Sequence, residues 1–263
     1  EGKNDYDFLP KDHPEYIKYI ERTCANPKDE FKKKSCDNPN PTDWTASKVD
    51  LKIQQIKKVF EQRKRDGGSY PDMLALTEIE NYSVAQRLAQ ALGYENVLIT
   101  KGPDKRGINV ALLYKQNSAF QALGSQEIHV PTELEHPTRP ILEVSFKLNN
   151  GQHLYVYVNH WPAQLAPTSE PRMVAAKALK EAILKRKKQN PNAFILATGD
   201  FNTIDQDAPH PFNDSLLMPN PYVILKDVQS AYALHYVKEF NSRMKAFPRG
   251  TYFFGRKQEW INL

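Results

Sequence analysis

Short apolar segments that alternate with helical patterns constrain the fold of this 263-residue chain more than any other feature. Two of them, 141–148 and 154–159, flank Asn149-Asn150-Gly151 and are expected to form a hairpin. The other segments with strand character are 73–76, 96–100, 110–114, 194–198 and 251–254. Helices that alternate with hairpin-linked strands indicate an α/β (α+β) protein in which two sheets pack face to face with helices outside.

Three segments have the apolar spacing of helices that cover a sheet. The first is 45–65, whose start Thr42 or Asp43 can cap. The second is 83–92, which is followed by a glycine, the residue that most often ends a helix. The third begins after Ser169, which can cap it. We therefore expect helices on the outer faces of both sheets.

The composition is that of an ordinary globular domain, with 40% hydrophobic and 25% charged residues. We expect a single domain over 1–263, in which 1–41 is a surface insertion with one short helix near 14–22. No apolar run approaches the ~20 residues that a membrane-spanning helix needs, and the first residues are too polar for a signal peptide. A monomer without a membrane span is therefore expected.

The charge of the chain mildly favours polyanionic partners. The formal net charge is +5, and phosphate neutralisation by Lys and Arg supplies most non-specific affinity for nucleic acid. Basic residues cluster at 32–34, 63–65 and 185–188. The last two clusters fall at the ends of predicted helices, where cations also complement the helix dipole, so they do not require a DNA contact.

Cys24 and Cys36 are the only two cysteines, and both lie in a polar segment. In a secreted protein such a pair indicates a disulfide, whereas a cytosolic protein more often keeps both as thiols. A metal site is disfavoured because no His or further Cys has suitable spacing nearby. A disulfide would staple the insertion and would fit a secreted or periplasmic location.

Polar residues follow three of the predicted strands at the point where each strand ends. Asp200 and Asn202 follow 194–198, His160 follows 154–159, and Glu78 follows 73–76. One interpretation is turn chemistry, in which Asp200 and Asn202 bond only to nearby backbone groups. Three such ends in one chain instead favour a common site at the edge of the core.

The segments that carry these residues resemble a known family. In order, 72–81, 106–114, 159–162 and 199–202 are similar to motifs of the endonuclease/exonuclease/phosphatase superfamily, and most of all to its DNase I-like, bacterial extracellular nuclease branch. The resemblance implies a four-layer α/β/β/α sandwich. Thr77 departs from the pattern, because many members carry Gln there, and the first strand and the terminal Asp and Asp-His motifs are not visible. We therefore expect the chain to be an excerpt of a longer protein.

The resemblance also implies roles for the residues at the strand ends. Glu78 would bind Mg²⁺, with Mn²⁺ or Ca²⁺ as alternatives, since hard cations prefer carboxylate oxygens. His160 would transfer a proton to the leaving oxygen or bond to the phosphate, because histidine titrates near neutral pH. Asp200 would orient or deprotonate the attacking water, and Asn202 would donate to phosphoryl oxygens or hold Asp200. The structural alternative for Glu78 is a surface carboxylate.

Four further residues are candidates for binding the substrate phosphate. Arg106 is favoured because a guanidinium pairs bidentately with phosphate, and a solvated loop charge is its close alternative. Asn109 and Asn159 are weaker candidates. Arg172 could reach the same cleft from the start of its helix, but an exposed position in the first turn is the preferred interpretation.

Three functions are compatible with this sequence. The first is a divalent-metal-dependent nuclease acting on DNA or RNA, which the basic charge and the nuclease-like segment 159–162 favour. The second is a phosphatase or phospholipase of the same fold, acting on inositol phosphates or sphingomyelin. The third is a non-catalytic binding domain, which the unseen terminal Asp-His pair favours. The sequence indicates no protein partner.

Overall fold

The computed structural model describes residues 9–25, 36, 44–103, 107–116, 119–131, 137–164, 168–204, 207–216, 252–254 and 259–261. Its helices are α1 (Pro14–Ala25), α3 (Ala46–Arg65), α4 (Tyr82–Leu92), α5 (Glu170–Gln189) and the short π-helix η1 (Pro211–Leu216). Its strands are β1 (Met73–Ile79), β2 (Asn96–Ile99), β3 (Asn109–Tyr114), β4 (Phe120–Ile128), β5 (Ile141–Leu148), β6 (His153–His160), β7 (Phe194–Asp200), β8 (Tyr252–Phe254) and β9 (Glu259–Ile261). All expected strands and helices are present, whereas β4, β9 and η1 were not predicted.

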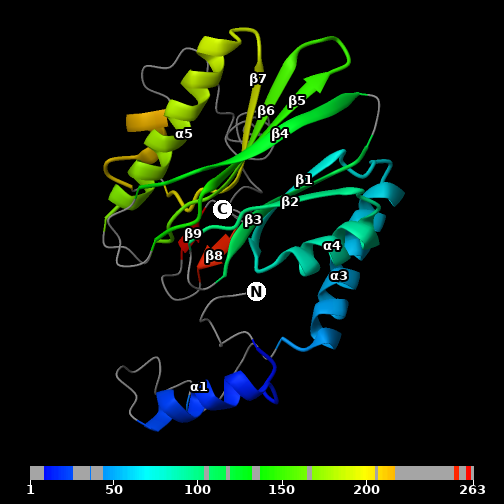
Figure 1. Ribbon diagram of the computed structural model, residues 1–263, viewed down its shortest axis with the longest axis vertical. Coiled ribbons are helices and arrows are strands. Elements are labelled where there is room, and N and C mark those ends of the chain that lie inside the picture. The colour runs from blue at the N-terminus through cyan, green and yellow to red at the C-terminus, as the bar shows by residue number, and fades with distance from the viewer. Residues whose placement is uncertain are drawn as a thin grey trace, which may run out of the picture.

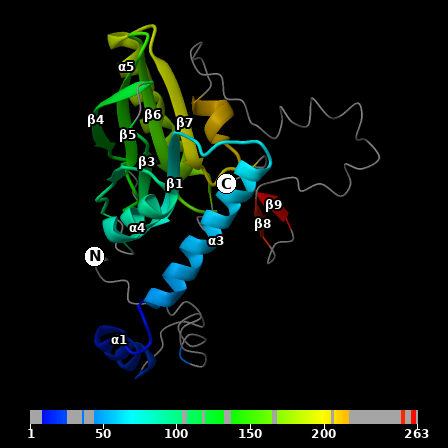
Figure 2. The ribbon, with the colours of Figure 1, turned by 90° about the vertical axis from the view of Figure 1, so that its right-hand side faces the viewer.

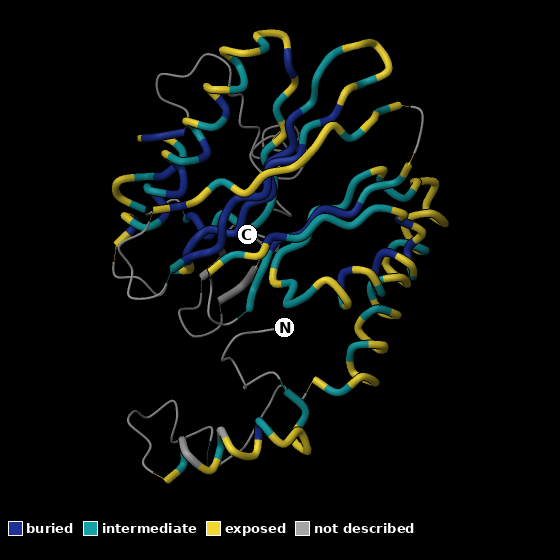
Figure 3. Tube along the Cα trace, in the orientation of Figure 1, coloured by how far each residue is buried: buried dark blue, intermediate teal, exposed yellow. Residues whose placement is uncertain are grey.

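Two sheets pack face to face, as predicted. The first sheet has the order β1-β3-β2 and is antiparallel, and the second has the order β4-β5-β6-β7, in which only β6 and β7 are parallel. Side chains of both sheets meet in one buried cluster, which contains Val110, Leu112, Leu142, Val144, Phe146, Val156 and Val158. Figure 3 shows this burial along the middle strands of each sheet.

Helices cover the outer faces of both sheets, which completes a four-layer α/β/β/α sandwich (Figure 1). Leu179 and Ile183 of α5 are buried against the second sheet, where α5 also provides the crossover that parallel β6 and β7 require. Leu88 and Leu92 of α4 are buried against the first sheet, and Phe60 of α3 packs beside them. The fold class predicted from the sequence is therefore confirmed.

The starts of two helices differ in detail from the predictions. Thr45 caps α3, because its Oγ1 accepts the backbone N–H three residues on at 3.3 Å, so the assignment of the cap to Thr42 or Asp43 is wrong. Ser169 precedes α5 but makes no capping bond, since its hydroxyl donates to the carbonyl of Pro209 at 2.7 Å. That hydroxyl ties the start of α5 to the segment after β7.

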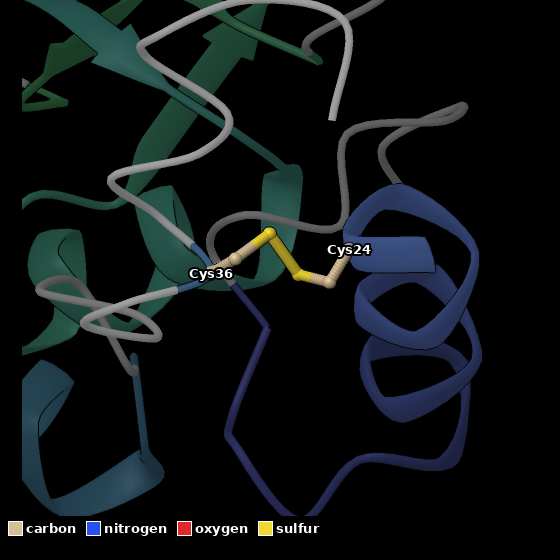
Figure 4. Close-up of a disulfide and its surroundings, with 2 residues drawn as sticks. All are labelled: Cys24 and Cys36. Atoms are coloured by element: carbon tan, nitrogen blue, oxygen red, sulfur yellow. A yellow bond between two sulfur atoms is a disulfide. The ribbon is translucent and has the colours of Figure 1, made fainter. Parts of the chain in front are cut away.

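The insertion contains α1, which lies beyond one end of α3 and away from both sheets (Figure 2). Cys24 in the last turn of α1 forms a disulfide with Cys36, with a Cα–Cα distance of 5.6 Å (Figure 4). Of the two alternatives for the cysteines, the structure shows the disulfide. Among the helices that the structure describes, none is both long and apolar enough to cross a membrane.

Candidate functional site

The parallel pairing of β6 and β7 places His160 directly opposite Asp200. Nε2 of His160 lies 3.6 Å from Oδ2 of Asp200, and the two side chains are 5% and 17% exposed. The next residue, Trp161, donates its backbone N–H to the carbonyl of Asp200 at 2.9 Å. The expectation that these two strand ends meet is confirmed by the register.

Gly199 allows the two strand ends to approach this closely. Its φ is +126°, and a Cβ atom built on it would lie 2.0 Å from the carbonyl oxygen of Asn159, its partner in the register. A side chain at this position would force β6 and β7 apart. The glycine that precedes Asp200 therefore permits the close approach of β6 and β7 beside the carboxylate and the imidazole.

Glu78 reaches the same edge from the first sheet. The register of β1 against β3 shifts between Leu76 and Ile79, so Glu78 lies in a β-bulge, where its φ is +57°. Bulges re-aim side chains beside functional sites, and a left-handed non-glycine residue persists only where its surroundings hold it. The side chain of Glu78 is exposed, and β1 contacts both β6 and β7.

The pKa of Asp200 is shifted by burial and by three neighbouring groups. Burial raises its pKa above the ordinary value, and the negative charge of Glu78 raises it further. The backbone N–H of Asn202, which donates to Oδ1 at 2.9 Å, and the positive charge of Arg139 lower this pKa, but the net shift is upward. A proton acceptor with a raised pKa is better matched to neutral pH than an ordinary aspartate.

Asn202 makes the turn bond that the sequence suggests and also bonds outside that turn. The bond from its N–H to Asp200 closes an Asx turn, and its Nδ2 donates to the carbonyl of Trp161 at 3.0 Å. Its φ is +49°, and the residue is 7% exposed. Asn202 thus holds Asp200 in place and also ties together the loops after β6 and β7.

Asn159 and Asn109 use their amide groups within the protein. Asn159 is fully buried, donates to the carbonyls of Tyr157 and Thr198, and accepts from Nε1 of Trp161 at 3.1 Å. The Oδ1 of Asn109 accepts two hydrogen bonds, from a threonine hydroxyl and a backbone N–H, and its Nδ2 donates to two backbone carbonyls. We therefore reassign both residues from phosphate binding to the positioning of strand ends. Arg106 lies outside the described residues.

Arg139 is a cation of this site that sequence reasoning missed. It is 5% exposed, and its Nη2 donates to the carbonyl of Trp161 at 3.3 Å. It directly precedes Pro140 and β5, which runs antiparallel to β6, so the start of β5 lies at the same edge as the end of β6. A polar residue just before an apolar strand was the available signal.

Arg172 was expected on the surface, and that expectation is wrong. Its side chain is 1% exposed and pairs with the carboxylate of Asp207, where Nη2 lies 2.6 Å from Oδ1 and Nε lies 3.2 Å from Oδ2. The guanidinium of Arg172 points from the first turn of α5 into the protein, where the buried carboxylate of Asp207 pairs with it. The pair lies behind Asn202 and does not face solvent.

The donor set at this edge suits a hard divalent cation held by few protein ligands. Glu78 offers an exposed carboxylate within electrostatic range of Asp200. Within the described ranges, no group of three or more His, Cys, Asp and Glu side chains could hold a metal ion. Mg²⁺ commonly uses one or two carboxylates and completes its shell with water and substrate, so Glu78 fits this kind of site.

The model of the Endonuclease/Exonuclease/phosphatase family matches residues 24–256 of the chain. No curated protein matches the chain. Similar solved structures include the human Nocturnin catalytic domain with bound sulfate, at 17% identity and a TM-score of 0.48, with 61% of each chain covered.

Two further structures are similar at comparable distance. Truncated TDP2 of Caenorhabditis elegans has 17% identity and a TM-score of 0.46, with 59% of this chain and 57% of that chain covered. A mannosyl-6-phosphatase of Bacteroides thetaiotaomicron has 15% identity and a TM-score of 0.48, with 66% of each chain covered. The chain thus spans less than two thirds of the length of each of these structures.

Proposed function

The chain belongs to the endonuclease/exonuclease/phosphatase family, and we propose that it is a divalent-metal-dependent phosphodiesterase that cleaves nucleic acid. The observation that carries the proposal is the meeting of His160 and Asp200, 3.6 Å apart, at the edge that Glu78 also reaches. A proton acceptor, a proton donor and a cation ligand are the groups that phosphodiester hydrolysis needs.

Each residue has one role in the proposed reaction. Asp200 accepts a proton from the water that attacks phosphorus, which its raised pKa favours. His160 donates a proton or a hydrogen bond to the leaving oxygen as the bond between that oxygen and phosphorus breaks. Glu78 would hold Mg²⁺, Mn²⁺ or Ca²⁺, which supplies charge neutralisation at the phosphoryl oxygens.

The positive charge beside Asp200 comes from Arg139 in this proposal. Its burial limits competition from water, and a guanidinium suits two phosphoryl oxygens at once. Arg106 stays a proposed second phosphate ligand. Because the Trp161 carbonyl accepts from both Arg139 and Asn202, the phosphate-binding charge and the Asp200 turn share one anchor.

The charge of α3 supports nucleic acid as the substrate, and the disulfide supports a secreted or periplasmic location. Helix α3 carries seven Lys and Arg residues against two acidic ones, in a chain of net charge +5, and a basic surface raises affinity for polyanions. The disulfide between Cys24 and Cys36 supports a secreted or periplasmic protein, because disulfides persist in oxidising compartments.

Digestion of supercoiled plasmid and of RNA, each with Mg²⁺ and with EDTA, tests this proposal. We expect cleavage with Mg²⁺ only, and a large loss of activity in His160→Ala. His153→Ala is the matched control, since His153 begins β6 and therefore lies at the opposite end of that strand from His160. Cleavage in EDTA, or full activity of His160→Ala, would contradict the mechanism.

The same preparation distinguishes the other two functions. A protein that cleaves no nucleic acid but releases phosphate from inositol phosphates would be a phosphatase. One that cleaves sphingomyelin instead would be a phospholipase. Binding of DNA without turnover of any of these substrates would identify a non-catalytic binding domain.

A further inference from the structure

Asn202 adopts a left-handed backbone conformation at the centre of the site. Its φ is +49°, which asparagine tolerates better than most residues, and three hydrogen bonds hold it there. Its N–H donates to Asp200 and its Nδ2 donates to the Trp161 carbonyl. Its own carbonyl accepts a short hydrogen bond from Nε2 of Gln164, which lies on the loop after β6.

Gln164 connects Asn202 to a buried carboxylate. Its Nε2 also lies 3.4 Å and 3.5 Å from the two carboxylate oxygens of Asp207. Asp207 Oδ2 in turn accepts the backbone N–H of Ile204 at 3.3 Å, so it fixes the loop that follows Asn202. One carboxylate therefore contacts both the loop after β6 and the loop after β7.

Arg172 completes this arrangement from α5. It forms the buried two-point pair with Asp207, and its Nη1 donates to the carbonyl of Ala163 at 3.4 Å. Desolvation makes a buried ion pair weak evidence for stability, so its presence behind the site needs another explanation. The guanidinium binds to groups on both strand-end loops, and that geometry fixes the loops relative to each other.

We propose that Gln164, Asp207 and Arg172 form a positioning clamp that holds Asn202, and through it Asp200, in reacting geometry. The inference rests on the proposed phosphodiesterase function. None of the three residues contacts the reacting atoms. Their effect on the reaction passes through the Asn202 backbone, whose N–H fixes Oδ1 of Asp200.

Gln164→Met tests the clamp most cleanly, because Gln164 is half-buried on a loop and methionine keeps its length without the donor. On a fluorogenic DNA oligonucleotide, we expect kcat to fall about 10- to 100-fold while KM changes less than about twofold, because only the reacting geometry loosens. The melting temperature should stay close to that of the wild type. Arg172→Met is a poorer probe, since it leaves Asp207 buried without its ion pair and therefore lowers stability at the same time as it loosens the clamp.

Arg186→Met is the matched control. Arg186 also lies on α5 and pairs with a buried carboxylate, Glu143, but at the other end of the helix. It should lower the melting temperature without changing kcat beyond about twofold. Equal loss of kcat in Arg186→Met and Gln164→Met would show that the clamp acts only through stability and would overturn the inference.

Amide hydrogen exchange separates failure of the clamp from failure of the proposed function. In Gln164→Met, exchange of the segment 200–204 should accelerate, while that of α4 stays unchanged. Unchanged exchange at 200–204 would overturn the clamp whether or not the protein is active. Accelerated exchange in a protein that cleaves no phosphodiester would keep the clamp and reject the nuclease.

Discussion

The two sheets contribute to the candidate site in different ways. The second sheet supplies His160 and Asp200 from adjacent, paired strand ends, and both side chains are largely buried. The first sheet supplies Glu78 from a bulge, and its side chain is exposed. Burial is what raises the pKa of a proton acceptor, whereas Mg²⁺ keeps several waters and needs an open ligand. The buried corner, formed by His160 and Asp200, therefore suits proton transfer, and the solvated corner, formed by Glu78, suits cation binding.

Asp200→Asn should have the largest effect, because it removes the proposed proton acceptor of the buried corner without changing the shape of the side chain. We expect kcat to fall about 10²- to 10⁴-fold. Initial rates on plasmid DNA at saturating Mg²⁺ measure the loss. Since asparagine keeps an oxygen that can accept the Asn202 N–H, an intact circular dichroism spectrum should accompany it. A loss below threefold would exclude Asp200 as the proton acceptor.

Gly199→Ala should break the buried corner by separating its two strands. The new Cβ would lie 2.0 Å from the Asn159 carbonyl, at a φ that side chains avoid, so we expect the free energy of unfolding to fall by about 3 kcal/mol. Gly151→Ala is the control, because Gly151 has φ +84° and no atom within 4 Å of the added Cβ. Urea unfolding of both variants compares them. Equal destabilisation would mean that strand proximity is unimportant.

The two strands and their polar ends could be predicted because the sequence signals for them are local. Alternation over 154–159 and a short apolar run before Asp200 identify two strands, and a polar residue at each end identifies the edge. The pairing of Cys24 with Cys36 was a stated alternative for a similar reason, since both lie in one short polar segment.

The remaining parts of the site depend on contacts distant in sequence. Arg139 lies at a strand start, and only the antiparallel order of β5 and β6 brings it to the edge where strands end. Arg172 is buried because Asp207, 35 residues further on, pairs with it. In the sequence, Asn109 and Asn159 look like phosphate ligands, but in the structure their amides bond to other groups of the protein. Residue type alone does not distinguish a side chain that binds substrate from one that bonds within the protein.

Glu78→Gln should affect the solvated corner alone. We expect about 10²-fold lower activity at limiting Mg²⁺, with partial recovery as Mg²⁺ rises, because a weaker ligand is compensated by mass action. Stability should hardly change, since the side chain is exposed. Glu80→Gln, two residues along the same segment, is the matched control. A loss that Mg²⁺ does not reduce would place Glu78 outside the cation site.

The smallest expected effect is that of Asp200→Asn on stability. This variant should be slightly more stable than the wild type although it is less active. Because the folded-state pKa of Asp200 lies above its ordinary value of 3.8, the folded protein binds this proton more tightly than the unfolded chain does. The free energy of unfolding therefore falls as pH rises from that value through the folded-state pKa, and the loss persists at neutral pH. Asp200→Asn removes this penalty, so the variant should melt slightly above the wild type at pH 7 and show no such gain below pH 4. A variant that is less stable than the wild type at pH 7 would show that the charged carboxylate stabilises the buried corner instead of straining it.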